Sequence, residues 1–133
     1  MNSYYLESSA AIKLFRKEPE TGALTKWIQN LKPGETLISS DIMRVELLGN
    51  LGSKPELLAQ AHVFLREVTL VQVRKAVLDQ AVLSMGLGLR TLDAIHHATA
   101  MRMAPDLDGV ICYDKRLITA LESFGLRVIS PAD

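Results

Sequence analysis

Arg90-Thr91-Leu92-Asp93-Ala94-Ile95-His96-His97-Ala98-Thr99-Ala100 is the stretch of this 133-residue sequence that decides the fold. Thr91 can serve as the N-cap of a helix, and Asp93 then falls in its first turn, where the helix dipole favours a carboxylate. At about 100° per residue, Asp93, His96 and His97 share one face beside an apolar stripe of alanines. The stretch therefore predicts a packed helix with an acid and two histidines along one side. Taken alone, an ordinary capped core helix, whose acid only suits the dipole, is the favoured explanation.

Composition indicates one globular domain over residues 1–133, with 48% hydrophobic and 23% charged residues. The formal net charge is zero, so the whole-chain balance gives no electrostatic argument for a polyanionic partner. Cys112 is the single cysteine and has no partner for an internal disulfide. The first residues lack the pattern of a signal peptide, and no apolar run approaches the ~20 residues of a membrane helix. We expect a cytoplasmic protein that does not enter a membrane.

Outward from the central stretch, short apolar segments alternate with amphipathic ones. The predicted strands are 3–6, 36–39, 68–71, 109–113 and 127–129, and the other predicted helices are 8–17, 22–31, 42–51, 55–66, 74–85 and 115–124. The serines after Glu7 can cap the first helix, and Ser40 or Asp41 can cap the third. This alternation predicts a three-layer α/β domain, with a mainly parallel central sheet flanked by helices.

Four acids stand where such a fold gathers functional groups, because ligands bind beyond the carboxyl ends of the strands. Glu7 and Asp114 follow predicted strands, and Asp93 begins a helix. Ile42, Val45 and Gly49 form the expected inward stripe of the helix 42–51. Glu46 lies at the edge of this stripe, where it could also reach solvent or pair with a base. Four like charges in one place repel, so we expect at least one raised pKa or a bound cation.

Carboxylate oxygens without cysteine ligands suit Mg²⁺ or Mn²⁺. Such an ion activates a water molecule and neutralises a phosphodiester under in-line attack. The acids therefore indicate phosphodiester hydrolysis. A phosphatase or receiver domain is disfavoured, because those proteins need an Asp at the end of the first strand and Glu7 stands there.

Four blocks of the sequence, in order, resemble the signature blocks of PIN domains, most closely the VapC toxins of bacterial toxin–antitoxin modules. They are residues 5–10 (YLESSA), 39–47 (SSDIMRVEL), 89–100 (LRTLDAIHHATA) and 112–117 (CYDKRL). The resemblance covers nearly the whole chain. It implies a metal-dependent endoribonuclease that cleaves RNA, with Glu46, Asp93 and Asp114 at acidic positions and with Ser9 and Thr91 at nearby hydroxyl positions. It also implies a cognate antitoxin and a homodimer.

The sequence departs from the family where Glu7 replaces the usual Asp after the first strand. The extra methylene moves the carboxylate by about a bond length, whereas functional groups must be held within ~0.5 Å. The competing hypothesis is therefore a PIN-fold module that binds RNA or protein with weak or lost catalysis. His97 stands where the family often has an aliphatic residue. We expect His96 to pack or to orient a neighbouring group.

Basic residues near the acids could position RNA phosphates without reading sequence. The candidates are Lys13, Arg16, Lys17, Arg44, Arg90, Lys115 and Arg116. Each could equally be solvated or ion-paired, and Arg44 could pair with Asp41 three residues earlier. The three Phe, three Tyr and one Trp are too few for base stacking to dominate recognition.

Overall fold

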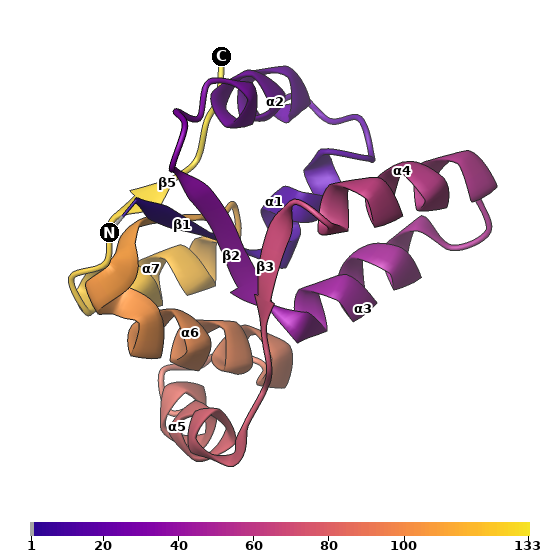
Figure 1. The fold of residues 1–133 in the computed structure, drawn as a ribbon. Coiled ribbons are helices and arrows are strands. Elements are labelled where there is room, and N and C mark those ends of the chain that lie inside the picture. Colours follow the sequence, from indigo (N-terminus) through magenta and orange to yellow (C-terminus); the bar gives the residue numbers. More distant parts are fainter. Residues whose placement is uncertain (1) are drawn as a thin grey trace.

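The structure, a computed structural model, describes residues 2–133 and is built on one parallel sheet (Figure 1). The five strands run in the order β3-β2-β1-β4-β5 and are all parallel to their neighbours. They are β1 (Ser3–Leu6), β2 (Thr36–Ser40), β3 (Val68–Val71), β4 (Leu107–Ile111) and β5 (Val128–Ile129). β1 is central, so the residues that follow it lie between the ends of β2 and β4.

Helices cover both faces of the sheet, which confirms the predicted three layers (Figure 1). The helices are α1 (Ser8–Lys13), α2 (Thr21–Gln29), α3 (Asp41–Leu51), α4 (Pro55–Leu65), α5 (Lys75–Met85), α6 (Thr91–Met103) and α7 (Lys115–Ser123), with a 3-10 turn η1 (Ala104–Asp106) before β4. One core joins the sheet to α5, α6 and α7, and the other joins it to α1, α2, α3 and α4. Tyr5 belongs to the first core and Leu6 to the second, because successive strand residues face opposite sides.

Two predicted caps are wrong. Glu7, not a serine, is the N-cap of α1, because its longer side chain folds back so that Oε1 accepts the backbone N–H of Ser9 at 3.0 Å. Thr91 is the first residue of α6 and not its cap; Arg90 holds the cap position without a side-chain hydrogen bond. Ser40 caps α3 as expected, through its hydroxyl and the N–H of Ile42.

The expected inward stripe of α3 is also wrong. Met43, Leu47 and Leu51 are buried, whereas Val45 is 71% exposed. A spacing of four residues keeps these three side chains on one face, and Glu46 lies beside it, half-buried. α6 is enclosed more completely than expected, since every residue from Ala94 to Ala100 is buried.

Other boundaries move by a few residues. β4 begins and ends two residues before the predicted strand, and α1 ends at Lys13 where a helix to residue 17 was predicted. Within residues 2–133, no helix is long and apolar enough to cross a membrane.

Candidate active site

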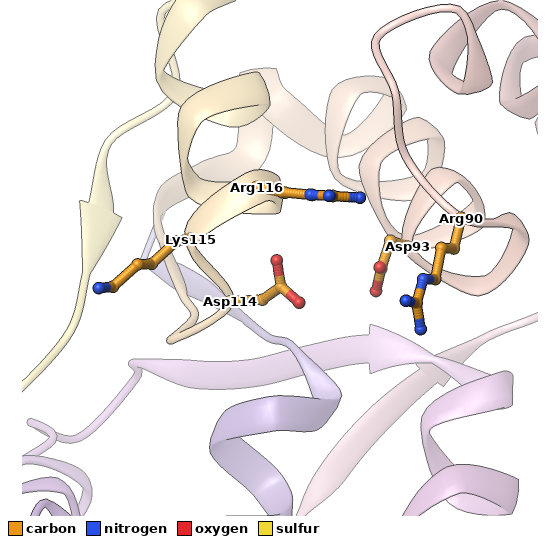
Figure 2. Close-up of a pocket in the computed structure, with 5 residues that line it drawn as sticks. All are labelled: Arg90, Asp93, Asp114, Lys115 and Arg116. Carbon is orange, nitrogen blue, oxygen red and sulfur yellow. The ribbon is translucent and has the colours of Figure 1, made fainter.

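Asp93 and Asp114 face one another in a pocket of about 360 Å³ beside the carboxyl ends of the strands (Figure 2). Asp93 lies in the first turn of α6. Asp114 is the N-cap of α7, where its Oδ1 accepts the N–H of Leu117 at 3.0 Å. Both acids are therefore positioned at the beginning of a helix, and the two helices, α6 and α7, pack on the same side of the sheet.

Three basic residues complete the lining of this pocket: Arg90, Lys115 and Arg116. Arg116 reaches over the pocket toward Asp93, Arg90 lies on the other side of Asp93, and Lys115 points away from both acids (Figure 2). None of the five lining residues forms an ion pair within the described part of the chain. The pocket therefore presents carboxylates and guanidinium groups that remain available to a ligand.

The acids act on one another electrostatically. The pKa of Asp93 is raised, chiefly by burial and then by the negative charges of Asp114 and Glu7, with Glu46 adding to the effect. The pKa of Asp93 is raised as expected, with burial as the larger cause and the neighbouring carboxylates as the second.

Glu7 is buried behind this pocket and does not line it. Its Oε1 accepts the Ser9 N–H and the Ser9 hydroxyl, and the Cys112 thiol donates to the same oxygen at 3.3 Å. Burial and the charge of Glu7 raise the pKa of the Cys112 thiol, so the thiol keeps its proton and remains a donor. Glu7 is therefore tied to its own helix through one oxygen.

Glu46 is likewise held by one oxygen. Its Oε1 lies 2.7 Å from Nε2 of His96 and 2.6 Å from the Ser8 hydroxyl, which donates to it. Burial raises the pKa of Glu46, but these hydrogen bonds outweigh it and the net pKa is lowered. Glu46 therefore stays ionised, and His96 contacts it through a hydrogen bond as well as packing in the core.

Asp93 and Asp114 fit a divalent cation by donor type. Within residues 2–133, no three Asp, Glu, His or Cys side chains are gathered closely enough to hold a metal ion as they stand. Mg²⁺, however, keeps several waters and is usually bound by one or two carboxylates together with substrate phosphates. The two pocket acids supply hard oxygens of this kind, and a bound cation would offset the negative charges that, after burial, raise the pKa of Asp93.

The remaining predicted site residues fall outside the pocket lining. Ser9 donates a hydrogen bond from its hydroxyl to Glu7 and accepts one from the N–H of Tyr113 at 3.0 Å, so it helps to hold the Glu7 carboxylate in place. Thr91 is exposed at the start of α6. Arg44 is exposed on α3 and forms no ion pair with Asp41 in the described chain.

The basic residues after β1 are placed differently from those of the pocket. Lys13 is engaged within the chain, where it pairs with Glu18 and Glu20 and lies 5.0 Å from the centre of the Tyr113 ring. Arg16 donates to the side chain of Asn50 at 2.9 Å and lines a separate small hollow. Of the basic candidates, only Arg90, Lys115 and Arg116 line the pocket that holds the acids.

The model of the PIN domain family matches residues 4–120 of this sequence. The chain belongs to the PIN-domain family. Among its relatives, Ribonuclease VapC46 of Mycobacterium tuberculosis is 39% identical, over 99% of this chain and 100% of the relative. Ribonuclease VapC35 of the same species is 34% identical, over 96% of each chain.

Solved structures share the fold of this PIN domain. The crystal structure of Mycobacterium tuberculosis VapC20, a toxin that cleaves the sarcin–ricin loop, superposes with a TM-score of 0.75 at 14% identity, over 96% of this chain and 99% of that one. A toxin–antitoxin complex from Klebsiella pneumoniae gives a TM-score of 0.73 at 18% identity, over 98% of each chain.

Sequence reasoning missed two members of the PIN-domain site, Tyr5 and Ser8. Both are buried, and both hydrogen-bond to His96, which lies about 90 residues later (separations of 91 and 88). A tyrosine inside a buried strand is the one local signal, since its hydroxyl must find a partner there.

Proposed function

We propose that this PIN-domain protein is a metal-dependent endoribonuclease and the toxin of a toxin–antitoxin pair. The observation that carries the proposal is the pocket in which Asp93 and Asp114 face Arg90 and Arg116, all four without ion pairs in the described chain. The relatives named VapC ribonucleases support the same reading.

Asp93 and Asp114 would hold the ion, Mg²⁺ or Mn²⁺, which when bound activates a water molecule and offsets the charge of the phosphodiester. The protein does the rest of the positioning. Arg90 and Arg116 bind the phosphates on either side of the acids, in the planar geometry for which guanidinium groups are suited. Glu46, held ionised by its hydrogen bonds, is the fixed carboxylate toward which a proton can move.

Partners follow from the same assignment. A cognate antitoxin would cover the pocket and its basic rim, as expected for a chain whose fold neighbours include the FitAcB complex of Neisseria gonorrhoeae and VapBC2 of Rickettsia felis. We also propose a cytoplasmic homodimer. Size-exclusion chromatography with light scattering, with and without the co-expressed antitoxin, tests both assemblies.

The decisive experiment follows cleavage of a panel of structured RNAs by antitoxin-free protein. Cleavage should require Mg²⁺ or Mn²⁺, stop with chelator, and fall at least about 100-fold in Asp93→Asn, which keeps the size of the side chain. Asp106→Asn is the matched control, because Asp106 is exposed on η1 and away from the pocket. Equal cleavage by wild type and Asp93→Asn would exclude the proposed nuclease.

A binding module with little catalysis is the second candidate, and the position of Glu7 favours it. This acid caps α1 and does not line the pocket. If Glu7→Asp cleaves RNA and wild type only binds it, the binding module is the better assignment.

A further inference from the structure

Four elements of the fold meet in a hydrogen-bonded group outside the Asp93–Asp114 pocket. Tyr5 lies in β1, Ser8 is the first residue of α1, His96 lies in α6 and Glu46 in α3. The Tyr5 hydroxyl lies 2.7 Å from Nδ1 of His96, and Nε2 of the same ring lies 2.7 Å from Oε1 of Glu46. Tyr5, Ser8 and His96 are almost completely buried, whereas Glu46 keeps 23% of its side chain exposed.

The tautomer of His96 follows from the need to satisfy buried donors. The Tyr5 hydroxyl is fully buried, and Nδ1 of His96 lies 2.7 Å from it, while the nearby hydroxyls of Ser39 and Thr99 donate to the carbonyls of Leu6 and Ile95. Burial and the charge of Glu7 raise the pKa of Tyr5 well above its usual range, so the hydroxyl keeps its proton. A buried hydroxyl proton without an acceptor destabilises the fold, so we assign Tyr5 as the donor and Nδ1 as the acceptor.

Nε2 must therefore carry the ring proton of a neutral His96. That N–H points at Oε1 of Glu46 and is shared with the Ser8 hydroxyl oxygen, 2.9 Å away. The Ser8 proton goes to the same Glu46 oxygen at 2.6 Å. All three donors in the group are then satisfied: the Tyr5 hydroxyl by Nδ1 of His96, and the Nε2–H of His96 and the Ser8 hydroxyl by Oε1 of Glu46. Oε2 of Glu46 makes no hydrogen bond in the described chain.

We propose that Tyr5, His96 and Ser8 are positioning residues that hold the Glu46 carboxylate, with Tyr5 acting through the tautomer of His96. This inference rests on the proposed function, because Glu46 matters only where the acids act on a substrate. In this group the Tyr5 hydroxyl donates to Nδ1 and so sets the tautomer of His96, and the ring then donates through Nε2 to one oxygen of the Glu46 carboxylate.

Two substitutions of His96 separate positioning from packing. His96→Gln places an amide N–H near the position of Nε2 and keeps a donor for Glu46, whereas His96→Asn places its amide near Nδ1 and leaves Glu46 without that donor. Both remove the ring from the same buried site. We expect His96→Asn to lower kcat and to weaken Mn²⁺ binding by about 10- to 100-fold, and His96→Gln to recover at least about half of that loss on a logarithmic scale, with KM for RNA unchanged.

Tyr5→Phe supplies the second arm. It should lower kcat by about tenfold in the wild-type background and have little effect in His96→Gln, because glutamine has no tautomer for Tyr5 to fix. Merely structural roles for these residues would give additive losses. Urea denaturation of each variant is the control that tests whether it is folded under the assay conditions.

Nitrogen-15 NMR of the metal-free protein reads the tautomer without any activity. We expect a protonated Nε2 and an unprotonated Nδ1 for His96 at neutral pH, and loss of that fixed pattern in Tyr5→Phe. A protonated Nδ1 in wild type overturns the proposal, as does equal Mn²⁺ affinity in His96→Gln and His96→Asn. If wild type shows the expected tautomer and Mn²⁺ affinities but no RNA is cleaved, the proposed function fails while the positioning of Glu46 stands.

Discussion

Replacing Glu7 by Gln removes one negative charge from the site and keeps the length of the side chain. In the structure, Oε1 of Glu7 accepts the N–H and the hydroxyl of Ser9 and a weaker bond from the Cys112 thiol. An amide oxygen can accept the same bonds, so the cap of α1 remains in place. What changes is the charge that acts on Asp93, whose pKa Glu7 helps to raise.

The cost in stability follows from those bonds. A hydrogen bond to a charged group contributes about 1.5–3 kcal/mol and a neutral one about 0.5–1.5 kcal/mol, so weakening the two Ser9 bonds costs about 2 kcal/mol. Relief of the repulsion with Asp93 offsets part of this. Glu7→Asp instead keeps the charge, loses about 0.8 kcal/mol for one buried methylene and gains a side chain preferred at N-caps. Glu7→Asp should therefore stay within about 1 kcal/mol of wild type.

Activity should depend on the charge at position 7 and not on the length of the side chain there. We expect Glu7→Gln to lower kcat for RNA cleavage by about 10- to 100-fold, as for other groups that support a metal site without binding the metal. Glu7→Asp should lower kcat by less than about tenfold. Cleavage is followed at saturating Mn²⁺, with urea denaturation in parallel. Glu122→Gln, an exposed residue on α7, is the matched control. Full activity in Glu7→Gln, or a folded but inactive Glu7→Asp, would refute this account of position 7.

Arg116→Ala should raise KM for RNA about tenfold, and the slope of log affinity against log salt concentration should become shallower by about 0.7. Lys26→Ala, at an exposed position of α2, should change neither quantity. Cleavage kinetics measure KM, and fluorescence anisotropy at several salt concentrations measures the slope. Burial lowers the pKa of His97, so its contribution to stability is present above the unfolded pKa of about 6.5 and is lost as the pH falls through the lower folded pKa. Wild type should therefore lose more unfolding free energy than His97→Leu between pH 7 and pH 5, and parallel curves would contradict this. Gly109→Ala should cost about 1–3 kcal/mol, because its Cβ would lie 2.7 Å from Cδ1 of Ile129; adding Ile129→Val, which removes that atom, should restore part of the loss in urea denaturation.

The layered fold could be predicted because each element carries its own signal. The strand 36–39 follows Pro33-Gly34 and precedes the capping residue Ser40, and the helices repeat their apolar residues every three or four positions. The Asp93–Asp114 pocket followed from the same pattern, since both acids stand at helix starts beyond the strands. These are local properties that need no knowledge of which segments touch.

The orientation of individual side chains could not be predicted in this way. Val45 is apolar and yet exposed, so the face of α3 was misjudged from the apolar residues alone. The turn of Glu7 back onto Ser9 depends on one extra methylene and two local donors. The tie between Tyr5 and His96 spans 91 positions and exists only once α6 is packed against β1.

The four acids therefore divide into two kinds, which explains how a Glu can stand at position 7. Asp93 and Asp114 line the pocket, where the Asp93 carboxylate accepts no hydrogen bond within residues 2–133 and Asp114 caps α7 through Oδ1 alone. Glu7 and Glu46 lie outside the lining, and buried donors hold one oxygen of each. Under the proposed function the two aspartates, with waters and phosphate oxygens, would hold the cation. Glu7 then need only supply negative charge at a fixed place, and for that task the donors around the carboxylate matter more than the length of the side chain that carries it.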